Sequence, residues 1–273
     1  MTEAAIATDL KGLTAVVTGG GAGIGQAMCL AWADAGMNVV VADLVAGRAK
    51  ETAGQVEAKG VRALAVACDV GDATSVEALA DAAYGAFGQV NILCNNAGVV
   101  QFGPVTLAPQ DDWDWLFHVN LWGVVNAVRT FVPRMRGQGG GFRHIVNTAS
   151  LSGVFAVPGL GVYTASKYAV VGISETLRDE LKKDGIGVSV LCPGPTPSRI
   201  GETARTTVEP GRRALDEVGG QFRFDETRSA ADVAATVKAG VLAGRLYLFP
   251  HPSGRRAAER RFNEMLADFE AQT

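Results

Sequence analysis

A tyrosine and a lysine four residues apart are the residues of this sequence best suited to proton chemistry. Tyr163 and Lys167 begin an amphipathic stretch, and this spacing places both side chains on one helix face. A phenol with a reference pKa near 10 is a poor base at neutral pH, but a neighbouring cation stabilises the phenolate. The pair therefore predicts general acid-base catalysis, with Tyr163 moving the proton. Taken alone, the same spacing also occurs between ordinary surface residues, so the interpretation depends on the surrounding motifs.

A glycine-rich turn follows the first expected strand and precedes the first expected helix. It reads Thr18-Gly19-Gly20-Gly21-Ala22-Gly23-Ile24-Gly25. A dinucleotide needs such a turn because its pyrophosphate approaches the backbone closely and then lies against the positive end of a helix. An ordinary glycine-rich loop is the alternative, which the order of strand, turn and helix disfavours. We expect the cofactor to contact Gly19, Gly21, Gly23, Ile24 and Gly25.

The carboxylate that ends the next expected strand indicates which dinucleotide binds. Asp43 follows Gly25 by 18 residues, close to the distance at which an acidic side chain meets the adenosine ribose. It can accept hydrogen bonds from both ribose hydroxyls and would repel a 2′-phosphate, at a cost of roughly 1 to 3 kcal/mol. The sequence therefore predicts NAD over NADP, with Leu44 beside Asp43 in the site. The alternative role for Asp43 is to cap the following helix.

Two further expected strands end in residues that can line a cofactor. The third ends at Asp69 and Val70, which we expect to flank the adenine, and the fourth ends at Asn95. Ligands bind at the carboxyl ends of strands in open parallel sheets. We therefore expect the cofactor to be framed by Asn96, Ala97 and Gly98.

Three motifs in this order resemble those of the classical short-chain dehydrogenase/reductase family. They are the turn Thr18-Gly19-x-x-x-Gly23-Ile24-Gly25, the fourth-strand motif Asn95-Asn96-Ala97-Gly98 and the pair Tyr163-x-x-x-Lys167. The similarity extends from about residue 10 to residue 250. It implies reversible hydride transfer between a nicotinamide and a secondary alcohol or ketone, in which Lys167 and the oxidised nicotinamide together lower the phenol pKa.

The resemblance also implies roles for residues that spacing alone does not single out. Ser150 matches the catalytic serine that donates a hydrogen bond to the substrate oxygen, with Ser152 as its neighbour. Asn120 matches the asparagine that helps to hold Lys167 in a water-linked proton relay. Lys167 is in addition expected to bind the nicotinamide ribose.

The segment after the sixth expected strand departs from the family pattern. It reads Pro193-Gly194-Pro195-Thr196-Pro197-Ser198, where the family more often has Val or Ile in place of Thr196 and Thr in place of Ser198. Ser198 retains a hydroxyl for the nicotinamide carboxamide. The cofactor contacts expected here are Pro193, Gly194, Thr196 and Ser198.

The elements that must position these residues follow from hydrophobic patterning. Runs rich in β-branched residues alternate with Ala- and Leu-rich amphipathic stretches, which is typical of βαβ units. Expected strands cover 13–18, 38–42, 62–67, 91–95, 143–148, 187–192 and 245–249, and expected helices cover 23–35, 46–59, 73–87, 110–136, 161–184, 230–243 and 255–270. The prediction is one α/β domain over 1–273, a Rossmann-type doubly wound parallel sheet of six to seven strands with helices on both faces.

Residues 194–228 lose this periodic pattern, and a segment of that length predicts a substrate-binding lid. Residues 250–273 form a C-terminal extension. The expected substrate contacts are mostly apolar and favour a hydrophobic or aryl alcohol over a sugar or a charged acid. They are Ser150, Leu151, Ser152, Phe155, Leu160 and Tyr163. Residues 193–200 also resemble the corresponding segment of bacterial dehydrogenases acting on benzylic alcohols of lignin-derived aryl ethers.

Composition disfavours several other classes of protein. The net charge is -3 with scattered basic residues, so neither nucleic acid nor an anionic membrane is an expected partner. The basic run Arg255, Arg256, Arg260 and Arg261 has helical spacing and is interpreted as a solvated helix face. The four cysteines stand far apart and the three histidines are separated, so we expect buried thiols and no metal site. No apolar run approaches the roughly 18 residues of a membrane span, and we expect a cytoplasmic protein.

The resemblance finally implies an assembly of identical chains. The helices expected over 110–136 and from Tyr163 onward would pair with copies of themselves across two-fold axes, which gives a homotetramer or a homodimer. Trp113, Trp115 and Trp122 lie on the first of these helices. An NADP-dependent ketone reductase and a noncatalytic NAD-binding protein on the same fold remain the alternatives.

Overall fold

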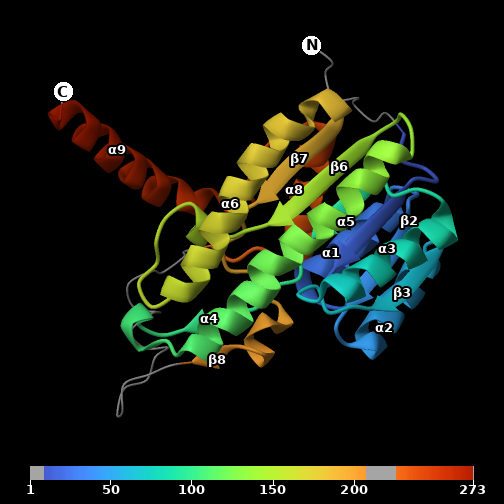
Figure 1. Cartoon of the computed structure of the whole chain (residues 1–273), viewed down its shortest axis with the longest axis horizontal. Helices are drawn as coiled ribbons and strands as arrows, with labels where there is room; N and C mark the ends of the chain where they lie inside the picture. Colours follow the sequence, from blue (N-terminus) through green and yellow to red (C-terminus); the bar gives the residue numbers. More distant parts are fainter. Residues whose placement is uncertain (1–8, 207–225, 273) are drawn as a thin grey trace.

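The strands of the computed structural model form one open parallel sheet. The structure describes residues 9–206 and 226–272, and within them the sheet has seven strands in the order β3-β2-β1-β4-β6-β7-β9 (Figure 1). Strand order reverses on either side of β1, which confirms the predicted doubly wound Rossmann-type architecture. Their bounds are β1 Thr14–Thr18, β2 Asn38–Asp43, β3 Ala63–Ala67, β4 Ile92–Asn95, β6 Arg143–Thr148, β7 Ile186–Leu191 and β9 Tyr247–Leu248.

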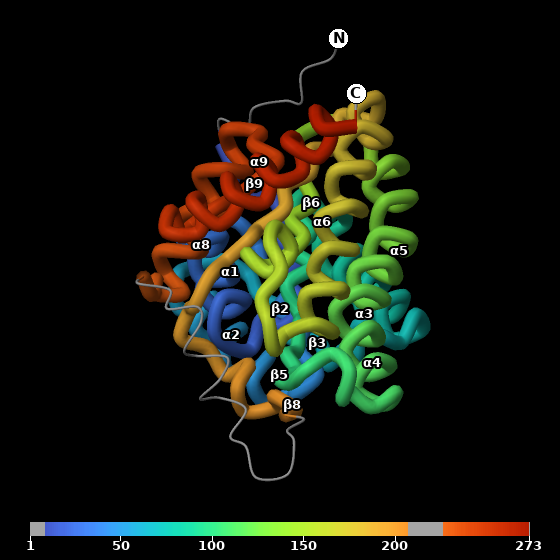
Figure 2. Tube along the Cα trace, turned by 90° about the vertical axis from the view of Figure 1, so that its left-hand side faces the viewer, coloured from blue at the N-terminus to red at the C-terminus, as the bar shows by residue number. Residues whose placement is uncertain are grey.

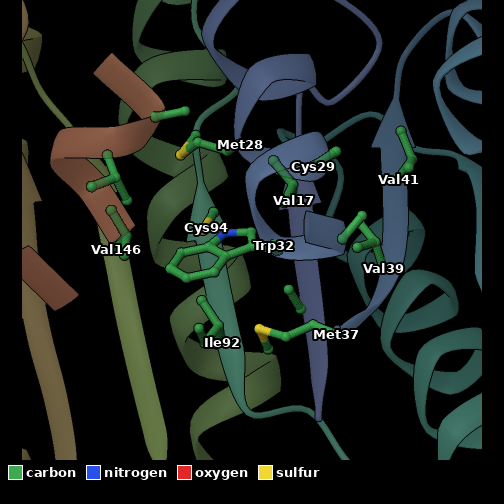
Figure 3. Close-up of a cluster of buried hydrophobic side chains, with 14 of the residues drawn as sticks. Val17, Met28, Cys29, Trp32, Met37, Val39, Val41, Ile92, Cys94 and Val146 are labelled. Carbon is green, nitrogen blue, oxygen red and sulfur yellow. The ribbon is translucent and has the colours of Figure 1, made fainter. Parts of the chain in front are cut away.

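Helices cover both faces of the sheet because successive strand residues point to opposite sides. Val17, Val39 and Val41 face Met28 and Trp32 of α1 in one core cluster (Figure 3). That layer contains α1 Gly23–Asp34, α2 Ala46–Glu57 and α8 Ala230–Leu242. A second cluster on the other face involves α3 Ala73–Phe87, α5 Gly123–Gly137 and α6 Gly161–Leu181.

The helix expected over 110–136 is divided in the structure. It consists of α4 Gln110–Phe117, a π-helical turn at His118–Trp122 and then α5. A π turn accommodates an additional residue within a helix, and such turns are frequent at functional sites. This turn carries Asn120, which is buried. Hydrophobic periodicity continues through the turn, so the pattern predicted one uninterrupted helix.

A second, two-stranded sheet lies beside the carboxyl edge of the main sheet. Its strands are β5 Gln101–Phe102 and β8 Arg205–Thr206, and they pair in parallel. The second strand belongs to the predicted lid, which also contains a 3-10 turn at Arg199–Glu202. Residues 207–225 of that prediction lie outside the described residues. Strands of two residues carry no alternating pattern, so the sequence did not predict this sheet.

The last helix leaves the body of the molecule. α9 Arg255–Ala271 extends away from the sheet (Figure 1), and in Figure 2 it lies in front of the body. Among the described residues, no helix is both long and apolar enough to cross a membrane. The prediction of buried thiols is confirmed, since all the cysteines are free and buried: Cys29, Cys68, Cys94 and Cys192.

Candidate active site

The turn between β1 and α1 is closed so tightly that only glycine fits at its ends. A Cβ on Gly25 would lie 2.1 Å from the Gly19 carbonyl oxygen, and one on Gly19 would lie 2.9 Å from the Ala97 Cα. α1 begins after Ala22 without a side-chain cap and without an acidic residue in its first turn. Ile24 packs partly buried against the core beneath. The turn therefore presents free N–H groups at a positive helix end, which suits a pyrophosphate.

A small hydrogen-bond network joins this turn to β4. The Thr18 hydroxyl accepts from the backbone N–H groups of Asn96 (3.0 Å) and Ala97 (3.1 Å). The Asn96 amide donates to the Thr18 carbonyl at 3.1 Å, and its oxygen accepts from the Thr148 hydroxyl at 3.4 Å. The fourth-strand motif thus joins the glycine turn to Thr148 at the end of β6, and Asn96 and Ala97 lie beside the turn.

Asp43 ends β2 beside the same turn. Its carboxylate accepts from the Gly21 N–H at 3.0 Å and from the Val45 N–H at 2.9 Å. The second contact is a local turn bond ahead of α2 and does not cap that helix, whose N-cap is Val45 and has no side-chain hydrogen bond, so the capping alternative is wrong. Leu44 is 72% exposed next to it. Arg48 lies on the same side of Gly21, since a Cβ there would lie 2.5 Å from the arginine Cβ and 2.8 Å from the Asp43 Oδ2. The Arg48 guanidinium pairs with Glu202 at 3.2 Å.

The two residues expected at the adenine, Asp69 and Val70, have different surroundings. Asp69 is partly exposed, accepts from the Gly71 N–H at 2.9 Å and lies 3.5 Å from the His118 imidazole. Val70 is buried against Gly123, where a Cβ would meet the valine at 2.7 Å. The structure therefore gives Val70 a packing contact with α5, and adds His118 as a neighbour of Asp69 that the sequence did not single out.

Tyr163 and Lys167 lie on one face of α6, as their spacing predicted. The Lys167 ammonium is 5.6 Å from the centre of the Tyr163 ring and donates to the Thr148 carbonyl at 3.0 Å. A Cβ on Gly98 would lie 3.4 Å from this ammonium and 3.3 Å from the Asn120 side-chain oxygen. Gly98 therefore lies where Lys167 and Asn120 approach one another, and both side chains are buried.

The Asn120 side chain uses all of its contacts to hold the loop after β4 against α6. Its oxygen accepts from the Val99 N–H at 2.9 Å, and its nitrogen donates to the Val99 carbonyl at 3.0 Å and to the Ser166 hydroxyl at 3.1 Å. Ser166 in turn donates to the Tyr163 carbonyl at 2.7 Å. The side chain thus positions the helix turn that carries Tyr163.

Ser150 follows β6 and lies beside Tyr163. Its hydroxyl accepts from the Ser152 N–H at 3.1 Å and donates weakly to the Pro193 carbonyl at 3.5 Å. The same carbonyl accepts from the Leu151 N–H at 2.9 Å. A hydrogen bond with this serine also lowers the pKa of the Tyr163 phenol. The structure thus brings Ser150 and Tyr163 together and leaves Ser152 as a buried neighbour whose N–H orients Ser150.

Burial shifts the pKa values of the central pair in opposite directions. It raises the pKa of Tyr163 to about 12, which the hydrogen bond with Ser150 only partly offsets, and lowers the pKa of Lys167 to about 8. Each shift has the sign expected when a charged form is removed from water. In the chain by itself the phenol pKa is therefore raised, and the predicted lowering requires positive charge beyond that of Lys167.

The segment after β7 is clamped by a histidine that the sequence analysis considered only as a metal ligand. His251 is 1% exposed. Its Nδ1 accepts from the Gly194 N–H at 2.9 Å, so the proton is on Nε2, which donates to the Pro195 carbonyl at 2.9 Å. Thr196 donates to the Gly194 carbonyl at 3.3 Å. Only the fold brings His251 to this segment, so no local pattern could have revealed it.

The remaining residues expected to contact the cofactor or the substrate lie at different depths. Ser198 lies over the glycine turn, where a Cβ on Gly23 would approach its Cβ to 2.8 Å. Leu151 and Phe155 are buried in a third core cluster, whereas Leu160 is partly exposed at the start of α6. Val105 packs against Gly161 and is 48% exposed, a candidate wall residue that the sequence analysis missed.

The glycine turn lies at a positive helix end, and a serine, a tyrosine and a lysine lie next to it at the carboxyl edge of a parallel sheet. This arrangement defines an oxidoreductase of the Rossmann type. Residues 13–209 match the family model of the short chain dehydrogenases. The chain belongs to this family.

Individual relatives extend the similarity over nearly the whole chain. A "C alpha-dehydrogenase" of Sphingobium sp. is 33% identical over 94% of this chain and 87% of its own length. The 3beta-hydroxysteroid dehydrogenase 2 of Eggerthella lenta is 36% identical over 89% of this chain and 95% of its own. The crystal structure of a short chain dehydrogenase/reductase from Burkholderia phymatum in complex with NAD has a TM-score of 0.87 and 35% identity, and covers 96% of this chain and 97% of that one.

Proposed function

We propose that this protein is an NAD-dependent dehydrogenase that interconverts a hydrophobic secondary alcohol, in particular an aryl alcohol, and its ketone. The observation that carries the proposal is the position of Ser150, Tyr163 and Lys167 at the carboxyl edge of the sheet that also presents the glycine turn. The turn fits a dinucleotide because its glycines let the backbone close tightly and leave the start of α1 without a side-chain cap, so that its N–H groups can face a pyrophosphate. NAD supplies, when bound, the hydride acceptor and a positive ring.

The chain's own residues divide the proton chemistry among them. Ser150 holds the substrate oxygen through its hydroxyl, and Tyr163 takes the alcohol proton in oxidation or returns it in reduction. A phenol with a pKa of about 12 is an effective acid only when positive charge stabilises its anion. Lys167 contributes part of that charge and binds the nicotinamide ribose. Asn120 keeps the first turn of α6 in place through Val99 and Ser166.

Cofactor choice in this proposal depends on Asp43. Its carboxylate faces the turn and would exchange its bond from the Gly21 N–H for bonds from ribose hydroxyls. Its charge would repel a 2′-phosphate. Arg48 is the residue that favours the alternative, an NADP-dependent ketone reductase, because its side chain begins beside Gly21 and its guanidinium can bind a phosphate. Glu202 pairs with that guanidinium and so supports NAD.

A hydrophobic substrate is supported by the apolar surroundings of the site. Val105 and Leu107 lie in the 3-10 turn before α4, and Val105 packs against Gly161 at the start of α6. Ile200 lies in the segment after β7, and each of the three is at least 38% exposed. One relative is named as a 3beta-hydroxysteroid dehydrogenase, which supports a hydroxyl-bearing apolar substrate, and another as a 1-deoxy-11-beta-hydroxypentalenate dehydrogenase, whose name also has a hydroxyl group. A noncatalytic NAD-binding protein is disfavoured because Ser150, Tyr163 and Lys167 are all present and adjacent.

The experiment that tests the proposal is a screen of secondary alcohols and ketones with each cofactor. We expect NADH formation with 1-arylalkanols and alicyclic alcohols, at a kcat/KM at least ten times higher with NAD than with NADP. Polyols and hydroxy acids serve as the polar controls. A preference for NADP would favour the reductase. NAD binding without turnover across the panel would favour the noncatalytic alternative.

The proposal includes an assembly of identical chains, a homotetramer or homodimer, in the cytoplasm. The helices expected to pair, 110–136 and 161–184, correspond to α4, α5 and α6, which lie side by side (Figures 1 and 2). Trp122 is 51% exposed on this layer. Sedimentation of the purified protein measures the number of chains.

A further inference from the structure

His118 and Asp69 place a hydrogen-bond donor beside an acceptor at the carboxyl edge of the sheet. The imidazole Nε2 lies 3.5 Å from the Asp69 Oδ1, and the two side chains are 46% and 45% exposed. A lone pair on Nε2 would face the carboxylate, so we assign the proton of the neutral ring to Nε2. A separation of 3.5 Å is too long for a strong hydrogen bond. Both groups therefore remain available to a ligand.

The loop that carries Asp69 is held in place by hydrogen bonds. The Asp69 N–H donates to the Ser75 hydroxyl at 3.1 Å, and Oδ1 accepts from the Gly71 N–H at 2.9 Å. Asn126 of α5 donates to the Val70 and Gly71 carbonyls, each at 3.0 Å. Among the described residues, the second carboxylate oxygen, Oδ2, accepts no hydrogen bond. The loop thus fixes one oxygen and leaves the other free to accept.

The π turn that carries Asn120 also supplies His118. The Asn120 side chain bonds to Val99 after β4, whereas His118, two residues earlier, reaches the loop after β3. A Cβ on Gly71 would lie 2.1 Å from the His118 Nε2. The ring therefore packs directly on the Gly71 backbone, a position that any side chain at residue 71 would deny it.

Strand order places this pair further from the glycine turn than Asp43. The sheet runs β3-β2-β1, and Asp43 at the end of β2 pairs with Ala67 at the end of β3. Asp69 follows Ala67 by two residues, on a strand about 4.8 Å beyond β2. In NAD the adenosine ribose lies between the pyrophosphate and the adenine. The order of turn, Asp43 and Asp69 along the edge therefore matches the order of pyrophosphate, ribose and base.

We infer that His118 recognises the adenine base of NAD together with Asp69. Adenine presents an amine donor beside a ring-nitrogen acceptor on each of its polar edges. The Asp69 Oδ2 accepts from the amine, and the His118 Nε2–H donates to the ring nitrogen beside it. Guanine carries an oxygen where adenine carries the amine, and that oxygen would face the carboxylate. The inference rests on the proposed NAD site and makes His118 a residue that determines base specificity.

Binding of NAD analogues to the full chain tests this role without any turnover. The 1-deaza- and 7-deaza-adenine analogues of NAD each lack one of the two ring nitrogens that lie beside the amine. We expect one of them to bind about five-fold more weakly than NAD in isothermal titration, and the other to bind like NAD. His118→Phe keeps an aromatic ring but removes the donor. It should weaken NAD binding about five-fold and leave the affinity of the weaker analogue unchanged.

Two further variants separate the donor from the position of the ring. His118→Gln keeps an N–H donor and should recover part of the lost affinity. Gly71→Ala leaves His118 intact but displaces its ring, so it should weaken NAD binding as His118→Phe does. Gly54→Ala in α2 is the matched control, because nothing lies within 4 Å of a Cβ there. Circular dichroism checks that each variant is folded.

The outcomes distinguish this inference from the proposed function. Unaltered NAD affinity in His118→Phe would reduce the ring to a stacking surface and overturn the donor role. An equal loss for NAD and both analogues would make His118 a structural residue, which also overturns it. Normal NAD binding with neither analogue weaker contradicts the inference alone. Failure of the unchanged chain to bind NAD contradicts the proposed cofactor, and the inference with it.

Discussion

The glycine turn after β1 and the segments after β6 and β7 lie at the same edge of one sheet but are fixed in different ways. In the turn, backbone meets backbone: a Cβ on Gly25 would lie 2.1 Å from the Gly19 carbonyl oxygen. Near Tyr163, buried side chains link neighbouring backbone segments through hydrogen bonds. Asn120 bonds to Val99 and Ser166, and His251 bonds to Gly194 and Pro195.

Because of this difference, the two regions tolerate different kinds of substitution. The turn fails when an atom is added, because there is no volume for it. The region around Tyr163 fails when a side chain is removed, because buried polar groups then lose their partners. The first region can bind the invariant part of a cofactor, and the second can vary with the substrate.

The largest effect of breaking the side-chain-held region is expected from Asn120. Asn120→Ala removes three hydrogen bonds and takes the side-chain partner from both partly buried backbone groups of Val99. The free energy of unfolding should fall by about 2 to 4 kcal/mol. Urea titration measures it. Gln110→Ala on the exposed part of α4 is the control and should change it by less than about 0.5 kcal/mol; an equally small effect for Asn120→Ala would contradict the account.

Breaking the backbone-held region requires only a methyl group. Gly25→Ala should weaken NAD binding roughly 100-fold, because the turn must open to admit the Cβ. Gly85→Ala in α3 is the matched control, since nothing lies within 4 Å of a Cβ there. Isothermal titration with NAD measures both variants. Unaltered affinity in Gly25→Ala would mean that the turn does not hold the cofactor.

His251 sharpens the comparison because we expect it to affect binding of the nicotinamide end of the cofactor only. His251→Phe removes both bonds to the 194–195 segment and should weaken NAD binding about ten-fold. ADP-ribose, which lacks the nicotinamide, should bind as before. His251→Asn, which keeps an acceptor near the Gly194 N–H, should lose less. Equal losses for NAD and ADP-ribose would make the role of His251 a general structural one.

The smallest effect is expected at the exposed pair between Arg48 and Glu202. Glu202→Gln releases the Arg48 guanidinium, and also that of Arg199, which pairs with the same carboxylate at 2.6 Å. It should raise affinity for NADP by two- to five-fold, the scale of a surface ion pair. Affinity for NAD should stay within experimental error. A fall in NADP affinity would exclude Arg48 as the group that discriminates between the cofactors.

The same contrast explains what the sequence could predict. The turn is a local constraint, so the motif from Gly19 to Gly25 and Asn96 can be recognised in the sequence. Strand patterning likewise predicts the sheet. The hydrogen bonds of His251 join residues 57 and 56 positions apart, and the strand pair β5-β8 has only two residues per strand. The π turn at Asn120 leaves the hydrophobic period nearly unchanged. Such features depend on tertiary contacts and were therefore missed.

The central claim is that Tyr163 is the proton-transfer group of an NAD-linked alcohol oxidation. The most direct test compares Tyr163→Phe with the unchanged chain, on one hydrophobic secondary alcohol from the screen, while NAD affinity is measured separately. We predict that kcat falls roughly 100- to 10,000-fold with NAD affinity within two-fold of the original. Turnover close to that of the unchanged chain, with NAD bound equally well, would contradict the claim.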